Sequence, residues 1–441
     1  MKMARYWNEE MECMPQEERK KLQSERLVDA VRRVYENVEF YRKRMQEAGV
    51  TPDDIHGVED LHKLPFMTKA DLRDYYPFGT FAVPMEDIVR IHASSGTTGK
   101  QVVVGYTRND LEIWDECVAR GLTSIGITNK DKMHVSYGYG LFTGGLGAHG
   151  GGTKVGAMVI PASVGNTKRQ MTLLKDFQTT AIACTPSYAL HIADALDELG
   201  LTKDDLNLKY GIFGAEPWTE QMRQEIENKL GLKAYDIYGL TEILGPGVSM
   251  DCSEKQGMHI QADHFIAEII DPETGEVLPD GSEGELVFTT ITKQGTPMIR
   301  YRTKDLTVLH TETCKCGRTT PRMEKIKART DDMLIVKGVN VFPSQIESVI
   351  LKYAEVEPHY MIYVDRENNS DSLDIHIEVN EQVFSDEVRS LEKLSRAIRK
   401  DIESTLGIGI NVKLVEPHSI QRSEGKAIRV MDKRKLYANN K

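Results

Sequence analysis

The sequence predicts an α/β protein with a large N-terminal α/β domain of several subdomains and a small α+β C-terminal domain. Between residues 110 and 240, helical patterns alternate with short β-branched runs, which is typical of helices covering a mostly parallel sheet. Turn dipeptides recur through residues 266–309, where the pattern becomes β-rich. After Thr330, about a hundred residues form a unit of normal domain size. We therefore expect domains over residues 1–329 and 330–441.

The composition is that of a soluble globular protein of the cytoplasm. Of the 441 residues, 40% are hydrophobic and 28% are charged. A net charge of -11 argues against nucleic acid as the main partner. The first residues are polar and no apolar run reaches membrane-spanning length, so we expect neither a secretory signal nor a membrane partner. Six cysteines in so long a chain do not suggest a disulfide framework.

Apolar residues at helical spacing predict the first elements. One or two amphipathic helices are expected within residues 15–49, ending at Gly49, and a short capped helix is expected after Thr68. The later elements of the N-terminal domain are expected in this order: helix 110–124, strand 133–136, helix 168–177, strand 181–184, helix 186–200 with Thr185 as N-cap, strand 210–213, helix 219–230 and strand 234–238.

The C-terminal domain has its own helix and strand signals. Ser344 and Glu347 have the spacing of a capping box, which predicts a helix over residues 345–353. Strict alternation from Leu373 to Val379 predicts a half-buried strand. A helix over residues 385–406 and a strand over residues 411–415 complete the predicted domain.

A loop rich in serine, threonine and glycine has the chemistry of a phosphate site. It lies between two β-branched runs, and it combines hydroxyl donors, flexible glycines and one lysine charge. The loop is not a Walker A motif, because Ser94 stands where the first glycine should be. The alternative is a mobile surface turn. The candidate phosphate ligands are Ser94, Ser95, Gly96, Thr97, Thr98, Gly99 and Lys100.

Polar residues that follow predicted strands form a second set of candidates. In the segment 238–242, Tyr238 is suited to stack on a base, Thr241 to bind a phosphate and Glu242 to hold Mg²⁺. Asp305, near the end of another strand, is suited to accept hydrogen bonds from a ribose. Lys426 lies on a glycine-bearing turn near the C-terminus.

The order of these motifs resembles the adenylate-forming superfamily of acyl-CoA synthetases, luciferases and peptide-synthetase adenylation domains. The motifs are the serine/threonine/glycine loop, Tyr-Gly-x-Thr-Glu, Tyr-Arg-x-x-Asp, Arg-x-Asp-Asp and a late Gly-Lys. Four segments are most similar to phenylacetate–CoA ligases: residues 137–145, 214–218, 263–265 and 337–344. The resemblance extends over nearly the whole chain, and it implies the adenylate-forming fold, a mobile C-terminal domain and a homodimer.

The resemblance implies a reaction in two steps. A carboxylate attacks the α-phosphate of ATP to give an acyl-adenylate and pyrophosphate, and the thiol of CoA then displaces AMP. Lys426, Glu242 and Thr241 would be the catalytic residues, and Asp331 would be the hinge on which the C-terminal domain moves. Besides the phosphate loop, the nucleotide would be bound by Ala215, Glu216, Asp236, Tyr238, Gly239, Thr241, Asp305 and Arg329.

The resemblance also implies an aryl pocket, but not which acid it takes. Tyr137 and Phe142 could instead be plain core packing. Residues 149–153 depart from what the bacterial phenylacetate enzymes lead us to expect, so indoleacetate, hydroxyphenylacetate or another aryl acid would fit as well. Two other functions stay open: an adenylating enzyme with a different acid or acceptor, and a non-catalytic nucleotide-binding protein. The pocket residues would be Tyr137, Phe142, Gly144, Gly145, Ala215 and Pro246.

Four residues outside these motifs have the types of a zinc site. Cys314 and Cys316 form a close thiol pair, and Cys252 and His259 offer two further ligands, which together would make a tetrahedral Cys3His site. The alternative is that these are reduced packing cysteines. The glycines of residues 145–150 match a dinucleotide fingerprint, but no suitable βαβ unit follows them, so we do not expect NAD.

Overall fold

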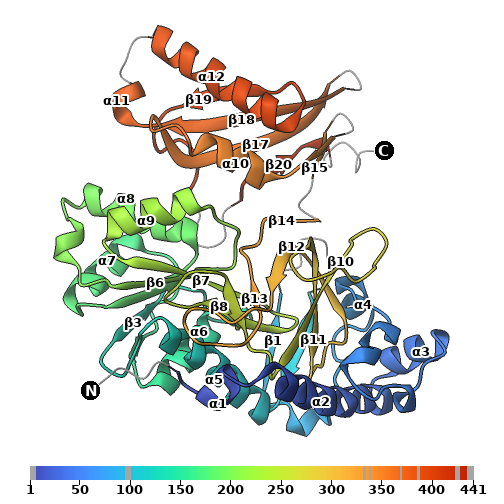
Figure 1. The fold of residues 1–441 in the computed structure, drawn as a ribbon. Helices are drawn as coiled ribbons and strands as arrows, with labels where there is room; N and C mark the ends of the chain where they lie inside the picture. Colours follow the sequence, from blue (N-terminus) through green and yellow to red (C-terminus); the bar gives the residue numbers. More distant parts are fainter. Residues whose placement is uncertain are drawn as a thin grey trace. The chain divides into compact units, whose positions relative to one another are not determined.

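The computed structural model describes residues 6–94, 101–330, 334–336, 339–367, 370–384, 388–422 and 428–434. The chain divides into two compact units (Figure 1). The domain boundary expected at residues 329 and 330 stays a prediction. Unit 1 comprises Met1–Cys184, Leu201–Ala215 and Leu232–Ile326, and unit 2 comprises Thr185–Gly200, Glu216–Gly231 and Lys327–Lys441.

Unit 1 is built on one long mixed sheet. Its strands follow the order β10-β11-β12-β13-β9-β8-β7-β6-β5-β3-β4, and β1 pairs with β2 in a separate antiparallel hairpin. The strands are β1 (Arg90–Ala93), β2 (Val103–Tyr106), β3 (Lys132–Val135), β4 (Met158–Ile160), β5 (Ala181–Cys184), β6 (Tyr210–Gly214), β7 (Lys233–Leu240), β8 (Leu244–Asp251), β9 (Met258–Ile260), β10 (Phe265–Ile270), β11 (Glu283–Thr290), β12 (Tyr301–His310) and β13 (Arg322–Met323).

The pairing changes from parallel to antiparallel along this sheet. Strands β4, β3, β5, β6 and β7 pair in parallel, whereas every pairing from β7–β8 to β11–β10 is antiparallel. The parallel part coincides with the alternating helix and strand patterns of the sequence, and the antiparallel part coincides with its β-rich region. The predicted α/β fold class is confirmed.

The helices of unit 1 begin and end at recognisable signals. In α2, Leu27, Val31 and Val34 form the buried stripe that predicted the helix, and α4 starts with a capping box between Thr68 and Asp71. The helices are α1 (Glu9–Glu12), α2 (Gln16–Asn37), α3 (Glu39–Glu47), α4 (Lys69–Asp74), α5 (Arg108–Ser124), α6 (Thr143–Val155) and α7 (Thr167–Asp176), with short 3-10 helices at Pro52–Asp54, Val58–Lys63, Met85–Asp87 and Lys203–Asp205.

Helix α6 was not predicted from the sequence, because glycine is a poor helix former. Its glycines allow it to lie unusually close to α5. A Cβ atom added at Gly147 would lie 2.5 Å from Trp114 Cζ2, and one added at Gly151 would lie 2.2 Å from Val118 Cγ1. The contact with α5 therefore requires glycine at these positions, and the close packing offsets the low helix propensity.

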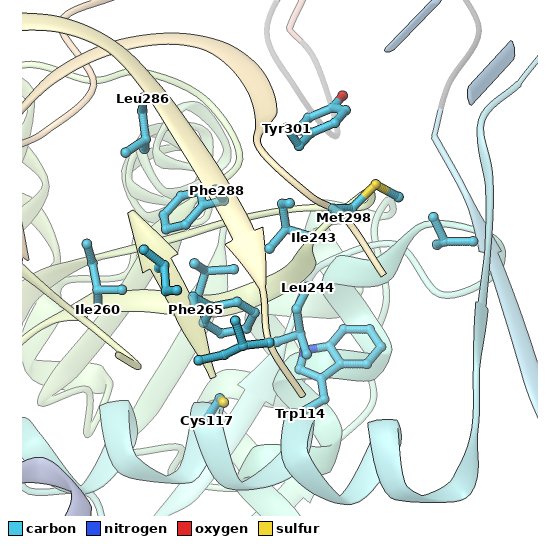
Figure 2. Packing of buried hydrophobic residues seen from close by; sticks show 14 of the residues in the cluster. Trp114, Cys117, Ile243, Leu244, Ile260, Phe265, Leu286, Phe288, Met298 and Tyr301 are labelled. Atoms are coloured by element: carbon cyan, nitrogen blue, oxygen red, sulfur yellow. The ribbon is translucent and has the colours of Figure 1, made fainter. Parts of the chain in front are cut away.

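The core of unit 1 joins α5 to the antiparallel part of the sheet. Trp114 and Cys117 point from α5 toward the apolar side chains of β8 to β11 (Figure 2). Trp114 is 1% exposed and Cys117 is fully buried. Helix α5 is thus packed against α6 on one side and against the sheet on another, and its position is fixed by both.

Unit 2 contains a second sheet with the strand order β19-β18-β17-β20 and a hairpin of β15 and β16. Leu373, Ile375 and Ile377 alternate into its core, so the strand predicted there is confirmed. The helices are α8 (Pro186–Glu198), α9 (Glu220–Leu230), α10 (Pro343–Ile350), α11 (Glu381–Phe384) and α12 (Val388–Leu406), and the strands are β14 (Ala328–Arg329), β15 (Leu334–Val336), β16 (Val339–Val341), β17 (Val356–Glu367), β18 (Ser370–Val379), β19 (Asn411–Val415) and β20 (Val430–Asp432).

The predicted capping box at Ser344 was wrong. Helix α10 begins at Pro343, because the fixed φ angle of proline suits the first helical position. Gln345, not Glu347, accepts the cap hydrogen bond, from the N–H of Phe342 at 3.0 Å. Among the described residues, no helix has the length and apolarity needed to cross a membrane.

We predict that Gly151→Ala lowers the melting temperature. Alanine should raise helix propensity by about 1 kcal/mol, but its Cβ atom would overlap with Val118 and force a repacking that costs about 1–3 kcal/mol. The matched control is Gly144→Ala, whose Cβ atom would meet the Tyr137 ring at an ordinary 3.4 Å. The melting temperatures of both variants and of the wild type are measured by thermal unfolding. A Gly151→Ala variant at least as stable as the wild type would contradict the close packing of α5 and α6.

Candidate active site

The phosphate loop joins the two strands of the β1–β2 hairpin. Residues 95–100 lie outside the described residues, but Ser94 is described. Its N–H donates to Val102 O at 3.0 Å, which closes the base of the loop. Its Oγ is buried and has no hydrogen-bond partner among the described residues.

Tyr238 and Asp305 come together on two strands of the sheet, although Asp305 lies in the middle of its strand and not near the end, as the sequence had suggested. Tyr238 lies near the end of β7, Asp305 lies in β12, and the Tyr238 hydroxyl donates to Asp305 Oδ2 at 2.6 Å. Asp305 is buried, so an ionised carboxylate there needs such donors. The sheet therefore brings together the residues predicted for the base and the ribose of a nucleotide.

The turn between β7 and β8 carries Thr241 and Glu242. It is very tight, because a Cβ atom added at Gly239 would lie 2.7 Å from Gly245 Cα. Thr241 O accepts a hydrogen bond from the Tyr106 hydroxyl at 3.4 Å. Glycine at position 239 is thus required by the close approach of the two strands, and it fixes where Thr241 and Glu242 lie.

Glu242 is a buried carboxylate with a lysine partner that the sequence did not reveal. Lys69 in α4 places Nζ 3.1 Å from Glu242 Oε1. Carboxylate oxygen is the kind of ligand that Mg²⁺ prefers. The chemistry of this side chain fits the predicted magnesium site.

A second lysine supports the same turn from inside the protein. Lys293 is buried, and its Nζ donates to Glu242 O at 3.0 Å and to Ile243 O at 2.8 Å. Burial lowers its pKa to about 8, and Asp110 and Glu242 oppose that shift. Lys293 belongs to no sequence motif, since its partners are backbone carbonyls about fifty residues away.

The predicted acid-pocket residues that follow β3 or begin α6 lie together. Tyr137 is buried, and Gly144 lies against its ring, where a Cβ atom would be 3.4 Å away. Gly145 lies closer to the backbone of the segment after β3, because a Cβ atom there would be 2.7 Å from Gly138 O. Phe142, the N-cap residue of α6, is 53% exposed and is therefore not a core residue.

Two further pocket candidates lie at the ends of strands. Ala215, after β6, has a φ angle of 73°, which is uncommon for a residue other than glycine and is found most often at functional sites. Pro246 lies in β8, and its carbonyl accepts a hydrogen bond from Trp114 Nε1 at 2.7 Å. Trp114, like Lys293, was not singled out from the sequence.

The remaining nucleotide candidates stay predictions. Glu216 Oε1 accepts a hydrogen bond from the N–H of Ser187, at the start of α8, at 2.7 Å. Asp236 is buried in β7, and Arg329 lies half-buried in β14. Asp331 and Lys426, the predicted hinge and catalytic lysine, lie outside the described residues.

The predicted zinc ligands come together in a buried cluster. Their ligand atoms all lie within 4.8 Å of one another. Cys252 Sγ lies 3.9 Å from Cys314 Sγ, and Cys316 Sγ lies 3.4 Å from His259 Nε2. Hydrogen bonds with Cys252 and His259 lower the pKa of the Cys316 thiol. The other ring nitrogen of His259 is 3.0 Å from Thr320 Oγ1, the kind of contact that orients a metal-bound histidine.

Comparison with known proteins decides the family. The AMP-binding enzyme model matches residues 13–292, and the model for the AMP-binding enzyme C-terminal domain matches residues 338–434. The chain belongs to the AMP-binding enzyme family. Within this family, ligases that form acyl-adenylates use ATP and CoA, typically with Mg²⁺, so the partners of this enzyme are small molecules.

Named relatives cover nearly the whole AMP-binding enzyme. It is 50% identical to a phenylacetate-coenzyme A ligase of Thermus thermophilus, over 97% of this chain and 99% of that protein. It is 51% identical to a phenylacetate-coenzyme A ligase of Escherichia coli, over 94% and 95% of the two chains. Its structure is similar to that of a 2-hydroxyisobutyryl-CoA ligase in complex with 2-HIB-AMP, with a TM-score of 0.93, 30% identity and coverage of 100% and 95%.

Proposed function

We propose that this AMP-binding enzyme is a ligase that activates an arylacetic acid with ATP and transfers the acyl group to CoA, releasing AMP and pyrophosphate. The observation that carries the proposal is its identity of about one half, along almost the full chain, to enzymes named phenylacetate-coenzyme A ligase. The contact between Tyr238 and Asp305 supports it, because it brings together two residues that the resemblance assigns to the nucleotide.

In the first step, an oxygen of the aryl carboxylate would attack the α-phosphorus of ATP, and the bond to pyrophosphate would break. Charge neutralisation and positioning lower such a barrier more than covalent help does. Asp305 and Tyr238 would hold the ribose and base, and Thr241 would bond the α-phosphate. Glu242 would hold Mg²⁺, which supplies positive charge to the phosphates. Lys426 would stabilise the charge on the reacting carboxylate and phosphate.

In the second step, the thiol sulfur of CoA would attack the acyl carbon, and AMP would leave. We propose that the C-terminal domain, residues 330–441, turns about Asp331 between the two steps, so that Lys426 acts only in the first. We also propose that the enzyme is a homodimer and works in the cytoplasm. All six cysteines are within the described residues and are free of disulfides, which fits a reducing compartment.

The aryl group of the acid would lie beside Tyr137. The glycines at the start of α6 leave the face of this ring uncrowded, with the nearest Cβ position at 3.4 Å. A flat ring of the substrate could stack in such a space. Phenylacetate is the acid that the names of the relatives favour, and hydroxyphenylacetate and indoleacetate are the alternatives to test.

We propose in addition that Cys252, His259, Cys314 and Cys316 bind a structural zinc ion. Tetrahedral bonds of about 2.3 Å from zinc to sulfur and about 2.0–2.1 Å from zinc to nitrogen place two sulfurs about 3.8 Å apart and a sulfur and a nitrogen about 3.6 Å apart. The observed distances of 3.9 Å between Cys252 and Cys314 and 3.4 Å between Cys316 and His259 are close to these. Four protein ligands would leave no open position, so the ion would stabilise the fold and take no part in the reaction.

The proposed activity is tested by measuring AMP release with ATP and Mg²⁺ across a panel of phenyl, hydroxyphenyl, indole and aliphatic acids, each with and without CoA. We expect turnover that requires CoA and is fastest with an arylacetate. If no aryl acid is turned over but another acid is, or if turnover needs an acceptor other than CoA, the adenylating alternative is favoured. Nucleotide binding with no turnover at all would favour a binding protein.

For Lys426→Ala, we expect adenylate formation to fall at least about 100-fold, because a group that stabilises transition-state charge is lost. Thioester formation from supplied acyl-adenylate and CoA should continue at nearly the wild-type rate. The two half-reactions are measured separately, by exchange of pyrophosphate and by release of AMP. If both half-reactions fail equally in a folded variant, the role assigned to Lys426 is wrong.

For Cys314→Ser, we expect zinc content to fall from about one ion per chain and the melting temperature to drop, because a structural site loses a thiolate ligand. Elemental analysis and thermal unfolding measure the two effects. The control is Cys13→Ser, since Cys13 lies outside the cluster and its loss should leave the zinc content unchanged. Purified wild-type protein without zinc, even after zinc is added, would contradict the proposal.

A further inference from the structure

We propose that three buried side chains, His92, Trp114 and Lys293, are positioning residues that hold the substrate-binding segments of this enzyme by their backbone carbonyls. Trp114 and Lys293 each donate to the carbonyl of a residue expected to contact substrate, and His92 donates to the carbonyl of a residue next to one. The proposal rests on the proposed function for the identity of those substrates. It adds residues that belong to none of the binding motifs.

Trp114 holds the acid-pocket segment of β8. Its indole Nε1 donates to Pro246 O at 2.7 Å, and the residue is 1% exposed. A buried carbonyl that loses its donor costs about 1–3 kcal/mol. The same indole lies where Gly147 leaves room for it, 2.5 Å from the position of an added Cβ atom. Trp114 thus fixes the distance between Pro246 and helix α6.

His92 holds the segment that precedes α6, which carries the pocket candidate Phe142. Its Nδ1 lies 3.0 Å from Leu141 O, which also accepts the N–H of Ala93 at 2.9 Å. Burial lowers the pKa of His92, so the ring is neutral. A carbonyl can only accept, and Nδ1 must therefore carry the proton. The next residue is Phe142, so this contact sets where the exposed aromatic side chain begins.

Lys293 holds the turn that carries the nucleotide residues. Its ammonium group donates to two successive carbonyls, of Glu242 and Ile243, and lies 4.7 Å from the centre of the Tyr106 ring. Tyr106 in turn donates to Thr241 O. A buried lysine with carbonyl and aromatic partners costs desolvation energy, which these contacts offset. The result is a fixed backbone for Thr241 and Glu242.

The three positioning residues meet through one aromatic cluster. Tyr106 stacks on Trp114 with ring centres 5.1 Å apart, and His92 packs edge-on against both, at 5.5 and 5.4 Å. Each ring lies against the other two, but each N–H donor ends on a different carbonyl. Loss of one donor should therefore loosen the segment that it holds and leave the other two segments held.

The test compares Trp114→Phe with Lys293→Met, since each removes a donor and keeps most of the side-chain volume. For Trp114→Phe we expect the KM for the aryl acid to rise about tenfold with little change in the KM for ATP, which corresponds to one lost hydrogen bond. For Lys293→Met we expect the opposite: a KM for ATP and Mg²⁺ raised about tenfold, a lower rate of adenylation, and a nearly unchanged KM for the acid.

Two controls separate positioning from general damage. Trp7→Phe removes an indole from the surface, and Lys132→Met removes a lysine that donates to a single carbonyl, Phe177 O, away from the site. Both should keep wild-type constants. Melting temperatures of all variants are measured alongside. If a folded Trp114→Phe or Lys293→Met variant keeps wild-type constants, or raises both KM values equally, the positioning role is wrong.

Failure of the proposed function would look different from failure of this inference. In that case the wild-type enzyme itself would turn over no aryl acid, while ATP and Mg²⁺ could still be titrated by calorimetry. Lys293→Met should then weaken nucleotide binding about tenfold and Trp114→Phe should leave it unchanged. Equal nucleotide affinity in both variants and the wild type would overturn the role of Lys293 even without an assay of turnover.

Discussion

The close contact between α5 and α6 is the constraint on which the site depends. Because Gly147 and Gly151 carry no side chain, α6 can approach α5 until Trp114 and Val118 fill the space. Trp114 can reach Pro246 only from this position. The first turn of α6 also lies against Tyr137. One helix contact therefore determines both the position of α6 beside Tyr137 and the support behind Pro246, two residues of the predicted acid pocket.

Buried polar groups hold the residues that are predicted to bind the nucleotide. Asp305, Glu242 and Lys293 are all buried, and each has a partner of suitable chemistry: a tyrosine hydroxyl, a lysine and a pair of carbonyls. Such groups destabilise a core when unpaired and make it specific when paired. The desolvation energy of these groups is spent on placing the turn at Thr241, as a reaction that depends on the position of this turn would require.

The sequence was sufficient to predict the helices and strands whose apolar residues recur with a clear period. The buried stripe of α2 and the alternation from Leu373 to Val379 appear as expected, because burial of one face produces those patterns. Helix α6 was missed, since its stability comes from packing against α5 and not from propensity. Lys293 was missed for a related reason. It binds backbone carbonyls, which every residue has, so the sequence does not mark its partners.

The same geometry bears on which acid the enzyme takes. Residues 149–153 depart from the expected phenylacetate pattern, yet they lie in the later part of α6. There Gly151 faces Val118 of α5, and His149 packs edge-on against Tyr139 with its Nδ1 3.3 Å from the hydroxyl. Tyr137 is contacted by the first turn of α6 instead. The departure therefore lies where α6 packs against α5 and Tyr139, and not at the contact of α6 with Tyr137.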